Sequence, residues 1–365
     1  MQIQGRFLLV DGLRGVASFV VVLFHVSSGN HIPQLLSIVP SWIAQIVRHG
    51  DLGVAIFFVL SGFVIAHSIY GKQVTISFAG RFMLRRSLRL DPPYWATIFL
   101  TLALAFLSAK VVPGKLPPDI SVGQLVTHIL YLQDVLGYSS INTVFWTLSL
   151  EVQYYLIYVV MLLATQKNLR ALYHGRLTII IIGAAALVSL LWPTGVVQSG
   201  LWPGSFLPLW YSFLLGVGAY WSWRNPSFTP FLIAFMLAIA MCAILRADGF
   251  SFVSVLTACL LWASAVTGRI FKALNWSWLQ FLGTISYSLY LTHNPIIGAS
   301  FRAGYMLTEH TLLWETIWWF VSLAVCIVVA AAMYRLIEGP SIRLSRNLRL
   351  KSSTHDSNMV EGPPK

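Results

Sequence analysis

Several ionisable side chains lie inside apolar segments of the sequence, where a charged group is costly and therefore points to a function. Arg14 and His25 share the first such segment and are eleven residues apart. In a helix this spacing returns both side chains to nearly the same face, roughly 16 Å apart along the axis. Because histidine exchanges protons readily near neutral pH, the pattern predicts acid–base chemistry at His25, with a fixed cation on the same face.

Two later apolar segments carry polar side chains to a similar depth. One contains Glu151 between Trp146 and Tyr155, and the other ends near His293. A carboxylate beside a histidine orients the ring and stabilises its protonated form, so we expect Glu151 to pair with His25. The alternative is that Arg14 forms a local ion pair with Asp11, that His25 packs structurally and that the shared depth is a coincidence.

A basic segment lies before the third long apolar stretch. Arg85, Arg86 and Arg89 fall within about one helical turn, and forked guanidinium groups suit phosphate oxygens. The rigid Pro92–Pro93 step beside them favours a positioned site in a cytoplasmic loop. The alternative is the ordinary positive charge of a cytoplasmic loop, or contact with anionic lipid headgroups.

The composition predicts that membrane-spanning helices position these side chains. The chain has 365 residues, of which 57% are hydrophobic and only 10% charged, whereas soluble domains carry about 25% charged residues. Ten apolar segments predict an all-α integral membrane protein with about ten transmembrane helices, and a shorter segment at 120–136 predicts an interfacial or loop helix. The ten lie near 8–28, 51–71, 93–110, 143–164, 177–193, 205–223, 229–246, 250–268, 277–298 and 311–335.

The net charge of +12 indicates orientation rather than nucleic-acid binding. Eighteen Lys and Arg residues fall in one alternating set of loops and the tails, against five in the other set. The positive-inside rule then places both termini in the cytoplasm. The three cysteines, Cys242, Cys259 and Cys326, lie in apolar segments without metal-ligand spacing, so no metal site is expected. We expect residues 1–345 to form one membrane domain and residues 346–365 a disordered cytoplasmic tail.

At these residues the sequence resembles acyltransferase family 3, a family of polytopic membrane acyltransferases. The resemblance covers roughly residues 8–160 and 280–345, and five motifs carry it in the family's order. They are Val10 to Ala17 through His25, Gly53 to Phe63, Arg86 and Arg89, Trp146 to Tyr155, and Ser286 to His293.

The resemblance implies an acyl-CoA donor, with acetyl-CoA as the family default, and a carbohydrate hydroxyl as acceptor, in the inner membrane of a bacterium. His25 would act as general base or transient acyl acceptor, with Glu151 orienting it or the acceptor. The phosphates of coenzyme A would be held by Arg14, Arg85, Arg86 and Arg89, and the acceptor by Asp51, His293, Tyr155 and Trp146. The competing class is a transporter or flippase of a glycan or lipid-linked substrate, which also uses intramembrane charges.

The predicted orientation can be tested by topology mapping. Reporter fusions after residues 72 and 272 should report the cytoplasm, because these positions lie in loops rich in Lys and Arg. Fusions after residues 115 and 302 should report the opposite side of the membrane. A map that placed Arg86 and Arg89 outside the cell would overturn the orientation and the phosphate assignment together.

Overall fold

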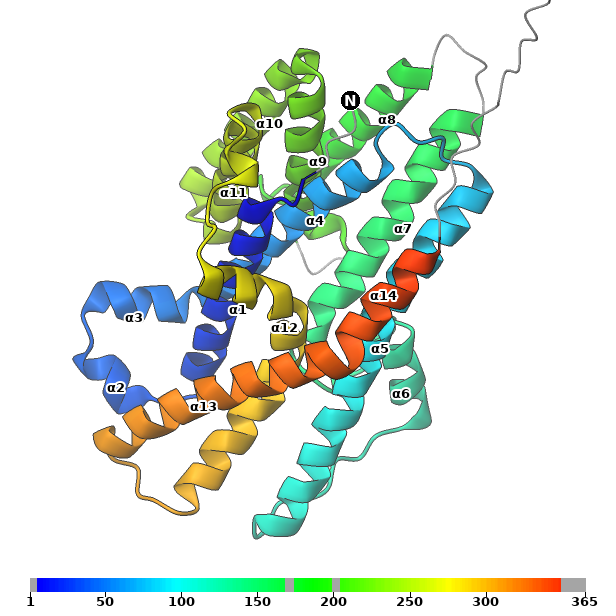
Figure 1. Ribbon diagram of the computed structural model, residues 1–365. Helices are drawn as coiled ribbons and strands as arrows, with labels where there is room; N and C mark the ends of the chain where they lie inside the picture. The colour runs from blue at the N-terminus through cyan, green and yellow to red at the C-terminus, as the bar shows by residue number, and fades with distance from the viewer. Residues whose placement is uncertain (1–4, 168–173, 199–203, 349–365) are drawn as a thin grey trace, which may run out of the picture.

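The computed structural model describes residues 5–167, 174–198 and 204–348, and every regular element in them is helical. Long helices occupy all ten segments expected from the sequence, and four short helices join them (Figure 1). The long helices are α1 (Leu8–Ser28), α4 (Gly53–Ile69), α5 (Ile76–Val111), α7 (Phe145–Lys167), α8 (His174–Ser189), α9 (Trp210–Arg224), α10 (Thr229–Arg246), α11 (Gly249–Val266), α12 (Ser277–Tyr305) and α13 (Leu312–Met333). The short helices are α2 (Pro33–Ile38), α3 (Ser41–Arg48), α6 (Val122–Ile129) and α14 (Gly339–Asn347).

Seven of the described helices are long and apolar enough to cross a membrane: α1, α4, α5, α7, α10, α11, and α13 continuing into α14. The prediction of an all-α, multi-pass membrane protein is therefore confirmed. Helices α8, α9 and α12 also lie where spans were expected. Within the described residues they are not among the seven helices that are long and apolar enough to cross a membrane. Helix α9 has only 15 residues, and α12 is rich in polar side chains. The predicted tail starts at residue 346, but Arg346 and Asn347 belong to helix α14. Residues 349–365 of the predicted tail lie outside the described residues.

The prediction of a loop for the basic segment is wrong. Helix α5 begins at Ile76 and runs without interruption through Pro92 and Pro93 to Val111, so the arginines before the prolines are helical. A proline inside a helix removes one backbone hydrogen bond. Side chains supply polar contacts nearby: the hydroxyl of Tyr287 donates to the Leu90 carbonyl at 2.9 Å. Tertiary contact with α12 thus supports a helix that the proline pair by itself disfavours.

The short helices lie at the margins of the bundle. Helix α6 confirms a helix in the segment 120–136, but with only eight residues. Helices α2 and α3 project to one side (Figure 1), and Ile38, Trp42 and Ile46 there are more than half exposed. Such exposed apolar side chains on a projecting helix suit the membrane interface.

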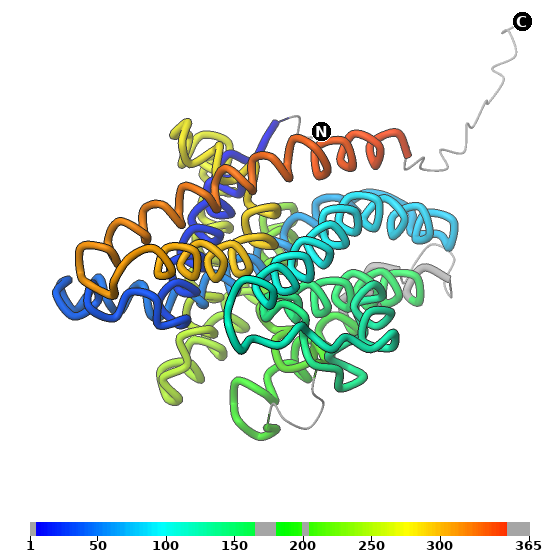
Figure 2. The backbone as a smooth tube through the Cα atoms, turned by 90° about the horizontal axis from the view of Figure 1, so that it is seen from below, coloured from blue at the N-terminus to red at the C-terminus, as the bar shows by residue number. Residues whose placement is uncertain are grey.

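Glycines let α1 and α12 approach closely, as Figures 1 and 2 show from two directions. A Cβ atom on Gly283 would lie 2.1 Å from the carbonyl oxygen of Asp11, and one on Gly15 would lie 2.7 Å from that of Leu279. Small residues at a helix interface allow backbone contact and dense packing in membranes. The contact fixes the register of α1 against α12, which carry Arg14, His25 and His293.

Helices α4 and α9 meet in the same way. A Cβ on Gly216 would lie 1.9 Å from the Val59 carbonyl oxygen, and one on Gly62 would lie 2.0 Å from that of Phe213. These helices form much of the main core, where Phe63, Phe213 and Tyr220 are almost fully buried.

Replacing Gly216 with alanine should lower the melting temperature in detergent, because the methyl group would force α4 and α9 apart. Overpacking of this kind costs about 1–3 kcal/mol. Gly80→Ala is the matched control, since Gly80 also lies in a helix and no atom lies within 4 Å of its added Cβ. The control should melt at the wild-type temperature or slightly above it; equal melting of both variants would contradict the close contact.

Candidate active site

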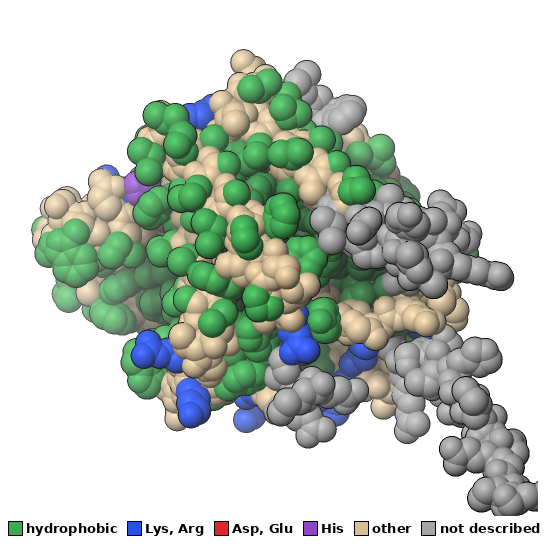
Figure 3. Space-filling model, turned by 90° about the horizontal axis from the view of Figure 1, so that it is seen from above, with side chains coloured by type: hydrophobic (Ala, Val, Ile, Leu, Met, Phe, Trp, Pro, Cys, Tyr) green, Lys and Arg blue, Asp and Glu red, His purple; other side chains and the backbone are tan. Residues whose placement is uncertain are grey.

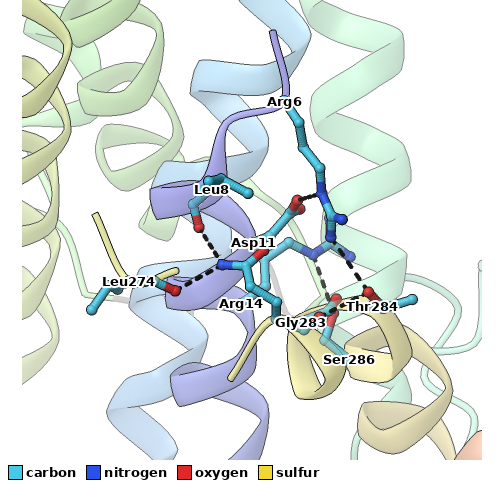
Figure 4. A network of polar contacts seen from close by, with 9 residues as sticks. Arg6, Leu8, Asp11, Arg14, Leu274, Gly283, Thr284 and Ser286 are labelled. Atoms are coloured by element: carbon cyan, nitrogen blue, oxygen red, sulfur yellow. Dashed lines mark hydrogen bonds and ion pairs between the residues drawn. The ribbon is translucent and has the colours of Figure 1, made fainter. Parts of the chain in front are cut away.

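Arg14 projects from α1 towards α12 without an acidic partner among the described residues. Its Nε donates to the Ser286 hydroxyl at 3.2 Å (Figure 4). Asp11, the alternative partner considered from the sequence, instead accepts from Arg6 at 2.5 Å, the one ion pair in the part of the chain that the structure describes. Arg14 thus forms no salt bridge among the described residues, but its charge acts on the nearby carboxylate of Glu338.

Arg14 and Glu151 line the same small cavity of about 50 Å³. Helices α1, α4, α7 and α12 form its walls, whose surface is mostly apolar although several polar side chains converge on it. The polar lining residues are Arg14, Ser61, Thr147, Glu151, Ser286, Tyr287 and Tyr290. Largely apolar cavities with a few placed polar groups are typical of small-molecule sites.

Glu151 is held by two hydroxyl donors. The Ser61 hydroxyl donates to its Oε1 at 2.8 Å, and the Tyr155 hydroxyl, one turn along α7, donates to the same oxygen. Tyr155 in turn lies under the guanidinium of Arg86, 4.9 Å from the ring centroid. The carboxylate thus belongs to a chain that runs from α4 through α7 to the basic segment of α5.

The ring partner of His25 is His293. The two ring centroids are 5.0 Å apart, and His25 is half-buried while His293 is fully buried. Nδ1 of His293 lies 3.0 Å from the Leu289 carbonyl oxygen, and since a carbonyl only accepts, this nitrogen carries a hydrogen. Its buried Nε2 has no partner among the described residues, so in the neutral ring it offers a free lone pair.

Tyr290 separates the histidine pair from the cavity of Glu151. Its ring centroid is 5.9 Å from that of His293, and its hydroxyl lies 2.7 Å from the Thr147 hydroxyl in the cavity wall. The described contacts contain no hydrogen bond between His25 and Glu151, whereas Tyr290 contacts His293 and also lines the cavity of Glu151. Asn294 donates to Asn142 at 3.1 Å and so ties α12 to the start of α7.

A second, basic pocket of about 370 Å³ lies next to this chain of contacts. It collects three of the four arginines predicted to bind phosphate, together with two cations from other elements, whereas Arg14 lines the first cavity. Its lining residues are Val64, Ser68, Lys72, Phe82, Arg85, Arg86, Arg89, Ile342, Ser345 and Arg346. Figure 3 shows basic side chains gathered towards one margin of the face that it views. No acidic side chain lines the pocket, so an external anion would meet uncompensated positive charge.

Two expected acceptor residues lie at the margin. Asp51 is exposed in the short turn Gly50–Leu52 that leads into α4, and this turn packs on α1 near Phe24. Trp146 is 37% exposed and its ring lies 6.4 Å from that of Phe58. Neither side chain makes a described hydrogen bond, so both stay predicted contact residues.

Sequence reasoning missed Glu338. This side chain is 2% exposed and lies in the π-helical turn Tyr334–Glu338, where it accepts from the Ser288 amide at 3.2 Å and hydroxyl at 2.6 Å. π-Helical turns occur often at functional sites. The available signal was a carboxylate three residues after the last predicted span, 311–335.

An all-α membrane bundle with a basic pocket, an apolar cavity and buried histidines defines the class of multi-pass membrane enzymes with an internal site. The comparison with protein families shows to which family within that class the chain belongs. The chain belongs to acyltransferase family 3, described as an acyltransferase domain, whose profile matches residues 8–335.

Curated relatives agree with this assignment. The chain is 26% identical over 91% of its length to YrhL of Bacillus subtilis, and 24% identical over 91% of its length to the peptidoglycan O-acetyltransferase OatA of Listeria monocytogenes. It spans about half of each, 54% and 55% of their lengths. It is also 26% identical to the acyltransferase MdmB of Streptomyces mycarofaciens, over 97% of this chain and 96% of MdmB. No solved structure matches the chain.

The two donors to Glu151 predict how its variants will fold. Glu151→Ala should lower the melting temperature, because the buried Tyr155 hydroxyl loses its acceptor and an unsatisfied buried group costs about 1–3 kcal/mol. Glu151→Gln keeps an acceptor oxygen and should melt close to wild type. Equal destabilisation of both variants would mean that the charge of Glu151, rather than its hydrogen bonds, stabilises the bundle.

Proposed function

We propose that this protein transfers an acyl group, with acetyl as the simplest case, from cytoplasmic acyl-CoA to a hydroxyl of an extracytoplasmic or lipid-linked carbohydrate. Membership of the acyltransferase family supports the reaction type. The observation that carries the proposal is the paired imidazoles of His25 and His293, which lie beyond the cavity lined by Arg14 and Glu151.

The basic pocket supports an acyl-CoA donor. Coenzyme A carries several phosphate groups, and Arg85, Arg86 and Arg89 offer forked donors in a pocket without acidic side chains. Arg86 also lies on Tyr155, which donates to Glu151 in the neighbouring cavity. A donor with its phosphates in the basic pocket could therefore extend its thioester past Arg86 towards Glu151 and Arg14.

The histidine pair supports proton transfer at the acceptor. With His293 fixed by the Leu289 carbonyl, its free Nε2 is an acceptor for an N–H of His25. That contact would leave the other ring nitrogen of His25 unprotonated and able to act as a base. In this proposal His293 takes the orienting role that the sequence suggested for Glu151.

The reaction balances with these groups alone. His25 removes the proton of the acceptor hydroxyl as its oxygen attacks the thioester carbonyl; the carbon–sulfur bond breaks, and the departing thiolate takes a proton back from the imidazolium. In the second version, the imidazole attacks first and the acyl group passes through an acyl-histidine before reaching the hydroxyl. Arg14 would stabilise the developing oxyanion in either version.

Relatives indicate the class of acceptor. OatA is named as a peptidoglycan O-acetyltransferase, and a cell-envelope glycan is accordingly the acceptor we propose here. The remaining family-derived roles, contact of Asp51, His293, Tyr155 and Trp146 with the acceptor and residence in a bacterial inner membrane, are part of the same proposal.

Replacing His25 with alanine should abolish transfer while leaving the fold intact, since the side chain is half-buried and makes no described hydrogen bond. His293→Ala should lower turnover by about 100-fold or more, the usual contribution of a positioned acid–base group, without changing the KM for acetyl-CoA. The measurement is the transfer of radiolabelled acetyl groups from acetyl-CoA to cell-envelope glycans by protein in nanodiscs.

His49→Ala is the control, because His49 is exposed and its ring bonds only to the Gln45 carbonyl in its own helix. Substantial transfer by the His25 variant would remove this residue from the mechanism. A wild-type protein that moves glycan across the bilayer but does not consume acetyl-CoA would favour the transporter alternative.

A further inference from the structure

The basic segment of α5 forms only part of the basic pocket, which is also lined by Val64 and Ser68 of α4 and by Lys72. Helix α14 contributes Ile342, Ser345 and Arg346 to the lining. Residues three and four apart share a helix face, so these three define the side of α14 that faces α5. Arg343 does not line the pocket, and its side chain is exposed.

The cations of the pocket repel one another in the absence of an anion. The charges of Arg346 and Arg89 act on Arg85. Lys72, in the loop between α4 and α5, has its pKa lowered by burial and by the nearby charge of Arg85. None of these side chains has an ion-pair partner among the described residues, where Arg6–Asp11 stands alone. Arg86 lies within reach of the charge of Glu151, and Arg89 within reach of that of Glu338. The positive charge without a nearby carboxylate is therefore that of Arg85, Lys72 and Arg346, and it favours binding of an anion in that part of the pocket.

The cations differ in their distance from the catalytic cavity. Arg86 is the innermost, since it lies over Tyr155, which bonds to the cavity carboxylate Glu151. Arg346 is exposed on α14, and Lys72 lies in a loop, where it donates to the Ser68 carbonyl at 2.6 Å. A ligand with several phosphates would therefore present its thioester end to Arg86 and its far end to Arg346 and Lys72.

We propose that α14 closes the donor pocket and that Arg346 and Lys72 recognise the phosphate of the donor farthest from the thioester, which in coenzyme A is the 3′-phosphate of the ribose. This inference rests on the proposed function, because it assumes an acyl-CoA donor. It assigns selectivity for 3′-phosphorylated donors to a helix that the sequence placed mostly outside the site.

The test measures binding, and so needs no acceptor. Wild-type protein in zwitterionic nanodiscs is titrated with coenzyme A and with 3′-dephospho-coenzyme A, and the ratio of the two dissociation constants reports recognition of the 3′-phosphate. Arg346→Glu should weaken binding of coenzyme A by about tenfold, as expected for loss of a charge-assisted contact. Binding of the dephospho form should change by about threefold or less, so the two dissociation constants should become more nearly equal. Lys72→Glu should act in the same direction.

Arg343→Glu is the matched control, with the same charge change on the same helix but outside the pocket, and it should leave the ratio unchanged. An unaltered ratio in both the Arg346 and Lys72 variants, with wild type binding coenzyme A, would overturn the inference while leaving the proposed function intact. Failure of wild type to bind coenzyme A would overturn both. Selective loss of affinity for anionic phosphatidylglycerol in the Arg346 variant, with the ratio unaltered, would instead identify a lipid headgroup site.

Discussion

Backbone contact between α1 and α12 is the constraint on which the site depends. Gly15 and Gly283 remove the side chains that would hold the two helices apart. Once the backbones touch, Arg14 reaches Ser286 and the ring of His25 reaches that of His293. Because lipid offers no hydrogen-bonding partner to polar groups, such side chains are kept only where a neighbouring helix receives them.

The candidate site forms a continuous path rather than a single cluster. The basic pocket meets the cavity at Arg86, Tyr155 and Glu151, and Tyr290 separates that cavity from the histidine pair. The steps from Arg86 to Tyr155, from Ser61 to Glu151 and from His25 to His293 join side chains of different helices. In the proposed reaction the donor enters this path at the basic pocket.

Glu151 and His25 show that two residues at a similar depth in the membrane need not contact each other. Glu151 and His25 were expected to pair because the predicted topology places both at a similar depth in the membrane. In the structure the carboxylate faces α4, where Ser61 donates to it, and the histidine faces α12. Thr147, one turn before Glu151 on α7, contacts the hydroxyl of Tyr290 on α12.

The sequence by itself determined the all-α membrane class, the ten helical segments and the family motifs, because long apolar runs and local spacing follow from the chain alone. Tertiary structure decided which polar groups meet. Helix α5 continues through Pro92 inside the packed bundle, where Tyr287 of α12 donates to the Leu90 carbonyl. Arg346 reaches the basic pocket because a π-helical turn, which carries Glu338, leads from α13 into α14. These contacts join residues far apart in the chain, and periodicity gives the face of each helix but not the neighbour against which that face packs.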